Sequence, residues 1–264
     1  MAAWFKRKGI PPDASAVMAR VIILKYVFVK ALATPPPEYV AQCKKEWSTE
    51  EWNQYLGTAQ NQNAQQIERL HKSGLWTAMD VDERNFLEAG PEEISQKAHI
   101  DATWRSESIV CLLWALGYIS ELLPYDEQAN PELTNKLPTE PTELLIKKAT
   151  LRPFELIQKQ RDIAELWHWR SRTRQLQESG FGFRLPDGMS IEELLKKTSE
   201  NAATNRDIPA QIGNDFPAFD KAYRDLTTEE YSQATSISIE RHRAFNWLCG
   251  LAPGNRWADT PTET

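Results

Sequence analysis

The stretch Asp101–Leu123, DATWRSESIVCLLWALGYISELL, decides the fold of this chain. From Ile109 to Ile119 every residue except Gly117 is apolar. A helix that is apolar on all sides is buried inside a protein, because a surface helix keeps one polar face. We therefore predict a buried central helix over about residues 101–122, enclosed by other helices.

Charged side chains stand at the start of this apolar helix. Its first turns carry Arg105 and Glu107, close to the residues that are expected to be fully buried. Ionised groups inside a dry core are strongly destabilising unless each one has a hydrogen-bonded partner. The sequence thus predicts paired charges at one end of the core.

The rest of the chain also shows helical periodicity. Asp13 is the predicted N-cap of a helix that runs to about Leu32, because apolar residues recur after it at three- and four-residue spacing. Further helices are predicted over residues 38–46, 49–70, 80–87, 142–149, 154–178 and 190–200, and a last long helix runs from the capping box at Thr227 and Glu230 to Gly250. A turn or hairpin is predicted at Asp187-Gly188, and residues 201–222 are expected to be irregular. Because strand-like alternation is nearly absent, we predict an all-α fold.

Two divisions of the chain stay open. At 264 residues the chain is at the upper limit for one hydrophobic core, so residues 1–264 are predicted to form a single compact α-helical domain. Alternatively, residues 1–75 form a helical N-terminal subdomain that packs against a core of residues 76–264, because Ser73-Gly74 closes the first group of helices.

Composition excludes several classes of function. The net charge of −6 argues against a nucleic-acid-binding protein. No run approaches the roughly 18 consecutive apolar residues of a membrane span. The three cysteines are far apart and form no C-x-x-C pair, which predicts a reducing, cytoplasmic location. Basic Lys6–Lys8 and the run VIILKYVFV imitate a secretory signal, but Lys25 interrupts that apolar run.

The last long helix carries an arginine on its apolar side. Ala234, Ile237, Ala244, Phe245 and Leu248 form the apolar stripe. Arg241 falls on the same face, and its guanidinium cannot lose its charge, so it needs a carboxylate or carbonyl partner. We predict that Arg241 meets Glu107, with His168 as a third member, where three helices pack together.

This polar cluster has two interpretations. It is either a buried ion pair that fixes how the helices align, or a pocket that binds a small anion or performs acid–base chemistry. The candidate cluster comprises Glu107, His168, Glu240, Arg241, His242 and Asn246. A separation beyond about 6 Å between the Glu107 carboxylate and the Arg241 guanidinium would exclude the cluster, because a direct hydrogen bond needs about 3 Å.

Motifs for metals and cofactors are absent from the sequence. No two of His71, His99, His168 and His242 share a helical face at metal-ligand spacing, and there is no H-E-x-x-H, P-loop, G-x-G-x-x-G or G-x-S-x-G. We therefore expect no cofactor, no metal and a non-enzymatic protein-interaction or accessory module with a protein partner. The alternative is a small-molecule-binding protein or enzyme whose pocket contains Glu107, His168 and Arg241.

Three segments resemble a bacterial family of unknown function, DUF4272. They are WRSESIVCLLWALGYISELLP (104–124), LRPFELIQKQRDIAELWHWRSRTR (151–174) and ERHRAFNWLCG (240–250). The resemblance covers about residue 84 to the C-terminus and is less distinct over the first 80 residues. It implies a soluble bacterial protein whose six candidate cluster residues fall on motif positions. Because this family has no established reaction, the resemblance supplies no catalytic residues.

Overall fold

The computed structural model describes residues 9–137, 143–180 and 188–263. The helices are α1 (Ala14–Ala33), α2 (Pro37–Glu46), α3 (Thr49–Lys72), α4 (Val81–Glu88), α5 (Gln96–Ala115), α6 (Glu143–Lys147), α7 (Phe154–Glu178), α8 (Ile191–Thr204) and α9 (Thr228–Leu248). Short 3-10 helices lie at Trp76–Ala78, Pro131–Lys136, Tyr223–Asp225, Pro253–Asn255 and Trp257–Asp259. Within the described ranges, the strands are a two-residue hairpin, β1 (Pro217–Ala218) and β2 (Lys221–Ala222). The all-α prediction is confirmed.

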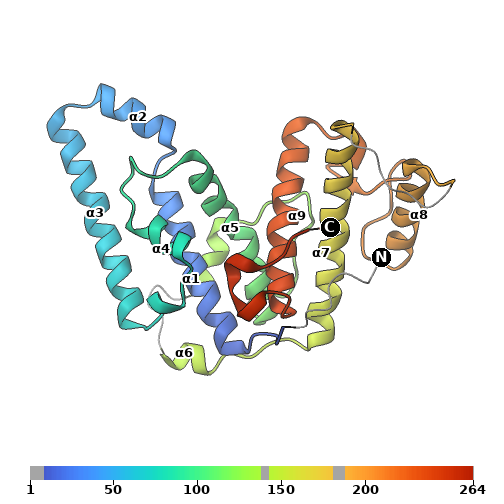
Figure 1. Ribbon diagram of the computed structural model, residues 1–264, viewed down its shortest axis with the longest axis horizontal. Helices are drawn as coiled ribbons and strands as arrows, with labels where there is room; N and C mark the ends of the chain where they lie inside the picture. The colour runs from blue at the N-terminus through green and yellow to red at the C-terminus, as the bar shows by residue number, and fades with distance from the viewer. Residues whose placement is uncertain (1–8, 138–142, 181–187, 264) are drawn as a thin grey trace.

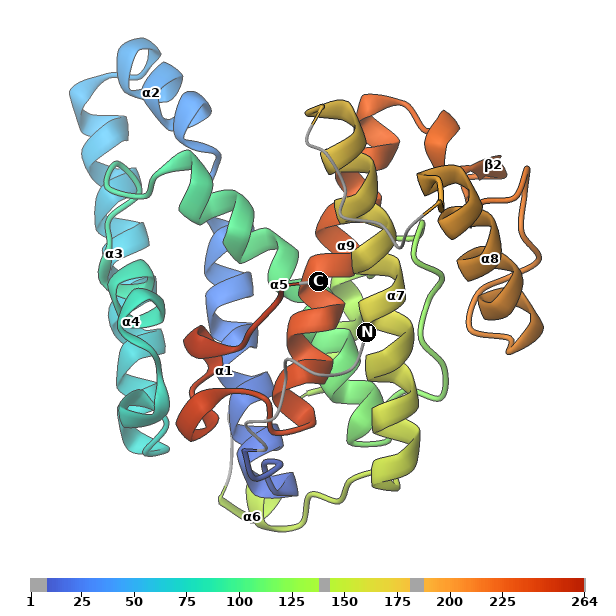
Figure 2. The ribbon, with the colours of Figure 1, turned by 45° about the vertical axis from the view of Figure 1, so that its right-hand side comes forward.

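The helices are arranged as two lobes with α5 between them (Figure 1). Helices α1 to α4 lie on one side, and α7, α8 and α9 lie on the other. Helix α5 packs against α1 of the first lobe and against α9 of the second, and α7 runs beside α9 (Figure 2). Since α5 contacts both lobes, it is the central element of the fold.

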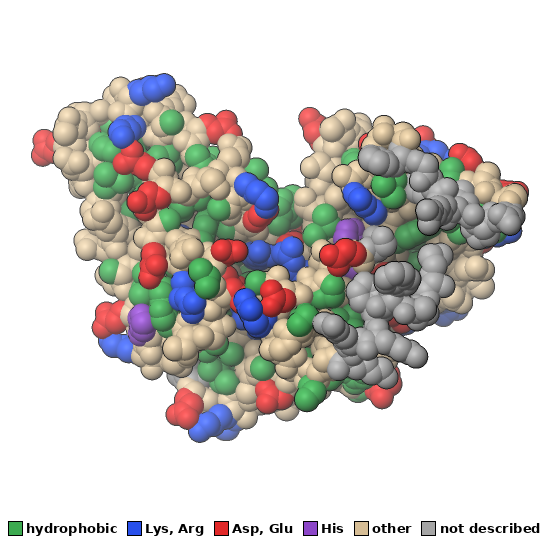
Figure 3. Space-filling view, in the orientation of Figure 1, with side chains coloured by type: hydrophobic (Ala, Val, Ile, Leu, Met, Phe, Trp, Pro, Cys, Tyr) green, Lys and Arg blue, Asp and Glu red, His purple; other side chains and the backbone are tan. Residues whose placement is uncertain are grey.

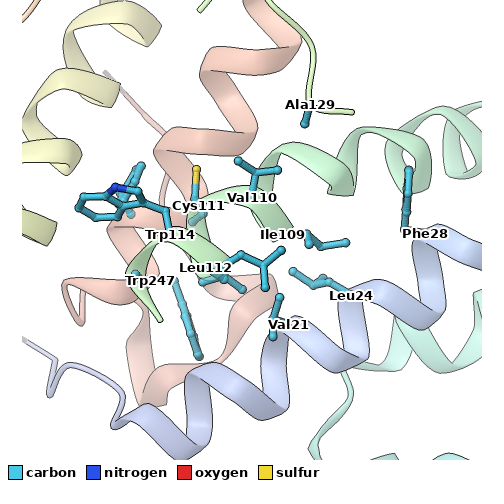
Figure 4. Packing of buried hydrophobic residues seen from close by; sticks show 14 of the residues in the cluster. Val21, Leu24, Phe28, Ile109, Val110, Cys111, Leu112, Trp114, Ala129 and Trp247 are labelled. Carbon is cyan, nitrogen blue, oxygen red and sulfur yellow. The ribbon is translucent and has the colours of Figure 1, made fainter. Parts of the chain in front are cut away.

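Burial of α5 comes from its apolar second half. Ile109 and Leu112 are fully buried and lie toward Val21 and Leu24 of α1 (Figure 4). On the side of α9, Trp114 makes an edge-to-face contact with Phe245, with ring centroids 5.9 Å apart. Contacts on both sides explain why this segment has no polar face. The prediction of a buried central helix is confirmed.

The predicted extent of the central helix, residues 101–122, is wrong at both ends. The helix begins at Gln96, where the Ser95 hydroxyl accepts a hydrogen bond from Ala98 N, and it ends at Ala115. Gly117 has a φ of 79°, and the Gly117 and Tyr118 amides donate back to the carbonyls of the last turn. Glycine adopts this left-handed conformation readily, so Gly117 ends the helix in a Schellman motif although apolar residues continue beyond it.

Charged side chains on the buried helix α1 all reach partners. Arg20 donates to both oxygens of Glu83 on α4 at 2.9 Å. Lys30 donates to the carbonyls of Leu87 and Ala89, where α4 ends, and its burial lowers the pKa of its ammonium to about 8. Basic groups stabilise helix C-termini, so Lys30 caps α4. No helix within the described ranges combines the length and apolar content needed to cross a membrane.

Most other predicted helices agree with the structure to within a few residues. The segment predicted as irregular, 201–222, differs at both ends, since α8 extends to Thr204 and β1 and β2 form a small hairpin. Of the predicted turn, Asp187 lies outside the described residues and Gly188 has a φ of 80°. Of the helix predicted over 142–149, residues 143–147 are helical.

A small second hydrophobic cluster lies between α2 and α3. Val40, Cys43 and Trp52 are buried there, and the rings of Trp47 and Tyr55 pack against Trp52. Helix α1 belongs to the main core instead, together with α5 and α9. The division of the chain at residue 75 stays a prediction.

Two glycines with similar backbone angles give a matched test of this architecture. Gly250 has a φ of 73°, and a Cβ on it would lie 2.6 Å from Pro11 N, whereas a Cβ on Gly117 would meet nothing within 4 Å. Gly117→Ala should cost about 1–2 kcal/mol of unfolding free energy, the penalty of the left-handed conformation. Gly250→Ala should cost clearly more, because the backbone of residues 9–11 must also move. Urea unfolding of both variants would measure the difference, and equal losses would contradict the close packing at Gly250.

Candidate functional site

Glu107 and Arg241 form an ion pair at the junction of α5 and α9. Arg241 Nε donates to Glu107 Oε2 at 3.0 Å, and both side chains are 0% exposed. Both residues lie on the buried faces of their helices, where an unpaired charge would be strongly destabilising. The expected contact between the two residues is therefore present.

The same two side chains also hold the segment that follows α5. Glu107 Oε1 accepts a hydrogen bond from Ala129 N at 2.7 Å. Arg241 Nη1 donates to Leu123 O at 2.5 Å, and Nη2 donates to Glu127 O at 3.2 Å. One buried guanidinium thus connects α9, α5 and a loop that has no helix of its own to satisfy its carbonyls.

Tyr125 covers the pair from the loop side. The Arg241 guanidinium lies 4.8 Å from the centroid of the Tyr125 ring, a cation–π distance. The Tyr125 ring also stacks on Trp167 of α7, with ring centroids 4.9 Å apart. Aromatic surfaces therefore exclude water from the ion pair.

Two clefts in the described part of the chain lie elsewhere. A cleft of about 400 Å³ lies between α1, α4 and α5, and its wall includes Phe86, Ala102 and Arg105. A smaller one of about 190 Å³ lies between α8 and the segment that contains Asp215. Neither cleft is lined by Glu107, His168 or Arg241, and the side chains of Glu107 and Arg241 are both 0% exposed, so a ligand cannot reach this ion pair.

His168 bonds to His242 and not to the ion pair. The Nδ1 atoms of the two rings, from α7 and α9, are 2.9 Å apart. Asn246, one turn after His242, has its Nδ2 2.9 Å from His242 Nε2 and 2.8 Å from Pro261 O. Arg161 Nε donates to Asn246 Oδ1 at 3.0 Å. Four side chains thus form one chain of hydrogen bonds between α7, α9 and the C-terminal segment.

This chain of hydrogen bonds fixes the proton positions on both rings. Because Asn246 Oδ1 accepts from Arg161, its Nδ2 is the donor to His242 Nε2. His242 Nε2 is then unprotonated, and the neutral ring carries its proton on Nδ1, which donates to His168 Nδ1. His168 in turn carries its proton on Nε2.

Both histidines are neutral near pH 7. Burial lowers the pKa of His168 to about 4, and Arg172 and Arg243 lower it further, while Glu263 opposes them. Burial likewise lowers the pKa of His242 to about 3, with contributions from His168 and Arg161. Two adjacent imidazoles in a dry site cannot both be charged, and here neither is.

Glu240 is the hub of a second ionic cluster on the α5–α9 interface. Its carboxylate accepts from Arg105 Nη1 at 2.9 and 3.0 Å, from Arg243 Nη1 at 2.6 Å and from Ser108 Oγ at 2.7 Å. Two guanidiniums share this carboxylate, and Asp101 acts electrostatically on both of them. The structure therefore divides the six predicted cluster residues into three groups. Glu107 pairs with Arg241, Glu240 belongs to its own ionic cluster, and the third group is His168, His242 and Asn246.

The sequence interpretation missed a third buried pair. Arg170 of α7 donates to both oxygens of Asp215 at 2.6 and 2.7 Å, and both side chains are almost fully buried. Asp215 also accepts from the Phe216 amide. Helix α7 has charged residues on most sides, so its buried face is not marked by an apolar stripe that would have revealed Arg170.

Metal ligands are not gathered anywhere in the described part of the chain. No group of three or more His, Cys, Asp and Glu side chains there is placed to hold a metal ion. His168 and His242 face each other, but their Nδ1 atoms already bond to one another.

The fold and these clusters define an all-α protein whose buried arginines, Arg20, Arg170 and Arg241, are each paired with a carboxylate. A family model described as "Domain of unknown function (DUF4272)" matches residues 8–192. The chain therefore belongs to the DUF4272 family. No curated protein and no solved structure matches it.

The matched region differs from the span of the sequence resemblance. It begins at residue 8 and so includes α1 to α4, where the motifs are less distinct, and it ends before α9. Glu107 and His168 lie inside the matched region, whereas Glu240, Arg241, His242 and Asn246 lie outside it. Family membership thus adds support only for the first two residues as family positions.

Replacing Arg241 tests the buried pair. Arg241→Met leaves the Glu107 carboxylate buried without its cation, so the free energy of unfolding should fall by about 3 kcal/mol or more. Arg172→Met, which removes an exposed arginine from α7, should change it by less than about 0.5 kcal/mol. Chemical denaturation measures both, and equal stabilities of the two variants would show that Arg241 is not buried as described.

The histidine pair predicts a loss of stability in acid. In the unfolded chain both rings bind protons below about pH 6.5, whereas in the folded chain they stay neutral until about pH 4 and 3. Stability contributed by the neutral pair is therefore present above pH 6.5 and falls as the pH drops toward 3. Since one pKa unit corresponds to about 1.4 kcal/mol, the loss from the two rings together should reach several kcal/mol.

Unfolding measured across this pH range provides the test. The double variant His168→Gln/His242→Gln should flatten the slope, and His71→Gln, which changes an exposed histidine on α3, should leave it unchanged. A slope that survives in the double variant would assign the acid sensitivity to other groups.

Proposed function

We propose that this chain is a non-enzymatic protein-interaction or accessory module. The observation that supports the proposal is the sealing of the predicted cluster, because Glu107 and Arg241 are fully buried and use their polar atoms on the loop that follows α5. Such a pair aligns helices and is not accessible to a substrate.

Two buried histidines and two cysteines are also poorly suited to catalysis. An efficient general base has a pKa near the working pH, and the pKa values of about 4 and 3 for His168 and His242 are well below it. Burial raises the pKa of the Cys111 thiol and raises that of Cys249 to about 12. Only a thiolate is nucleophilic, so these protonated thiols are unreactive.

Location and partner class belong to the same proposal. The cysteines Cys43, Cys111 and Cys249 are all free thiols, which fits a reducing compartment, and we propose the bacterial cytoplasm. The net charge of −6 disfavours nucleic acid as a partner. The proposed partner is therefore another protein, bound by one structural unit that comprises both lobes.

Capture of a partner tests this function. The tagged chain, produced in the cells from which it comes, should co-purify with one protein in fixed stoichiometry, and the two purified proteins should re-form a complex during size-exclusion chromatography. A chain that always elutes by itself, or a purified chain that turns over a substrate, would contradict the proposal.

A further inference from the structure

The cleft of about 400 Å³ between α1, α4 and α5 has an apolar wall. The apolar residues of this wall are Val27, Phe86, Ala89, Ile94, Ala98 and Ala102. Four of them, Val27, Phe86, Ile94 and Ala102, are buried members of the main hydrophobic core, so this part of the cleft is held in place. Clefts of this size with apolar walls and a few polar groups are the usual form of a binding site.

Carboxylates outnumber cations among the side chains that line this cleft. The carboxylates are Asp82, Glu83, Glu93 and Asp101, and the cations are Lys97 and Arg105. The ion pairs at these groups are Arg20 with Glu83, Lys97 with Asp101, and Arg105 with Glu240. Adding the buried or half-buried groups that pair with or act on the lining residues, namely Arg20, Lys30, Asp80, Glu240 and Arg243, still leaves a small excess of carboxylates. Asp82 and Glu93 have no ion-pair partner among the described residues.

These two carboxylates are exposed and keep unused acceptor atoms. Asp82 forms no side-chain hydrogen bond within the described ranges. Glu93 accepts from the Gly90 amide through Oε2 at 2.7 Å, and its Oε1 has no partner in the same part of the chain. Lys30 acts electrostatically on Glu93, but its ammonium is buried and donates to two backbone carbonyls at the end of α4. Lys30 therefore reduces the negative charge without occupying either acceptor.

The surface around the cleft carries charges of both signs. The space-filling view shows acidic and basic side chains mixed over the α1–α4 lobe and the hollow beside it, with apolar side chains among them (Figure 3). Local contacts must therefore select what binds. Asp82 and Phe86 are one turn apart on α4, so a free carboxylate adjoins the apolar wall. A side chain with an aliphatic stem and a cationic head fits this combination, because it buries the stem and leaves the head at polar groups.

We propose that the cleft between α1, α4 and α5 binds a lysine-bearing segment of the partner protein, with aliphatic stems on the apolar wall and ammonium groups at Asp82 and Glu93. The net charge of −6 also favours the approach of a basic segment over that of an acidic one. This inference rests on the proposed function, since it names the chemistry of the partner.

A fluorescently labelled hexapeptide of alternating lysine and leucine is the probe. Two further peptides replace lysine by glutamate, or leucine by serine. Fluorescence anisotropy should show binding of the lysine–leucine peptide that weakens with added salt, weaker binding of the lysine–serine peptide and none of the glutamate–leucine peptide. No binding of the lysine–leucine peptide, or equal binding of the glutamate–leucine peptide, would overturn the inference. Hexylammonium that binds as tightly as the peptide would assign the cleft to a small amine instead.

Neutral variants of the two carboxylates separate this site from general charge effects. Asp82→Asn/Glu93→Gln keeps the side-chain shapes and should weaken binding of the lysine–leucine peptide about fivefold. Glu178→Gln/Glu200→Gln removes the same charge from exposed positions on α7 and α8 and should leave the affinity within about twofold. Equal losses in both double variants would contradict a defined site.

Filling the cleft tests the apolar wall without a change of charge. Ala98 is half-buried on α5 and lines the cleft, so the larger side chain of Ala98→Leu should occupy part of the space and weaken binding about fivefold. Thermal unfolding checks that this variant is folded. An unchanged affinity of the folded variant would show that the peptide binds elsewhere.

The partner from the capture experiment distinguishes the two proposals. If that partner binds Asp82→Asn/Glu93→Gln as tightly as the wild type, the basic-segment inference is wrong and the proposed function stands. If the lysine–leucine peptide binds in the cleft but no stoichiometric partner is ever recovered, the proposed function is wrong.

Discussion

The structure depends on a buried arginine that has to be satisfied. Arg241 has no way to lose its charge inside the core, and its Nε and both Nη atoms find acceptors in Glu107, Leu123 and Glu127. These acceptors come from α5 and from the loop after it, more than a hundred residues away in the sequence. The requirement to pair one charge therefore fixes α9, α5 and the loop relative to one another.

Similar pairs recur between other distant segments. Arg20 with Glu83, Arg105 with Glu240 and Arg170 with Asp215 each connect two elements, and each arginine uses planar, directional donors. Apolar contacts tolerate small shifts of one helix against another, whereas a misplaced buried ion pair does not. In this protein the apolar core supplies the driving force, and the ion pairs specify one arrangement of the helices.

Sequence patterns predicted the helices and one ion pair, but not how the polar groups are distributed. Apolar spacing and capping boxes identified α1, α3, α8 and α9. Because one arginine, Arg241, lies in the apolar stripe of α9, the sequence also predicted that it has a buried partner. The end of α5 was missed because Gly117 interrupts an apolar run, and local backbone conformation overrode hydrophobicity there. His168 was assigned to the wrong cluster, since the pairing of residues from α7 and α9 depends on how these helices are rotated against each other, which periodicity does not report.

The close approach of Gly250 to Pro11 has a consequence for synthesis. The segment before α1 is synthesised long before the backbone against which it packs, because that backbone follows α9. Native contacts between such distant positions form slowly, because a long loop has to close before they contribute. Helix α1 can pack on α5 earlier in translation, whereas the segment before α1 gains its contact with Gly250 only after α9 has been made.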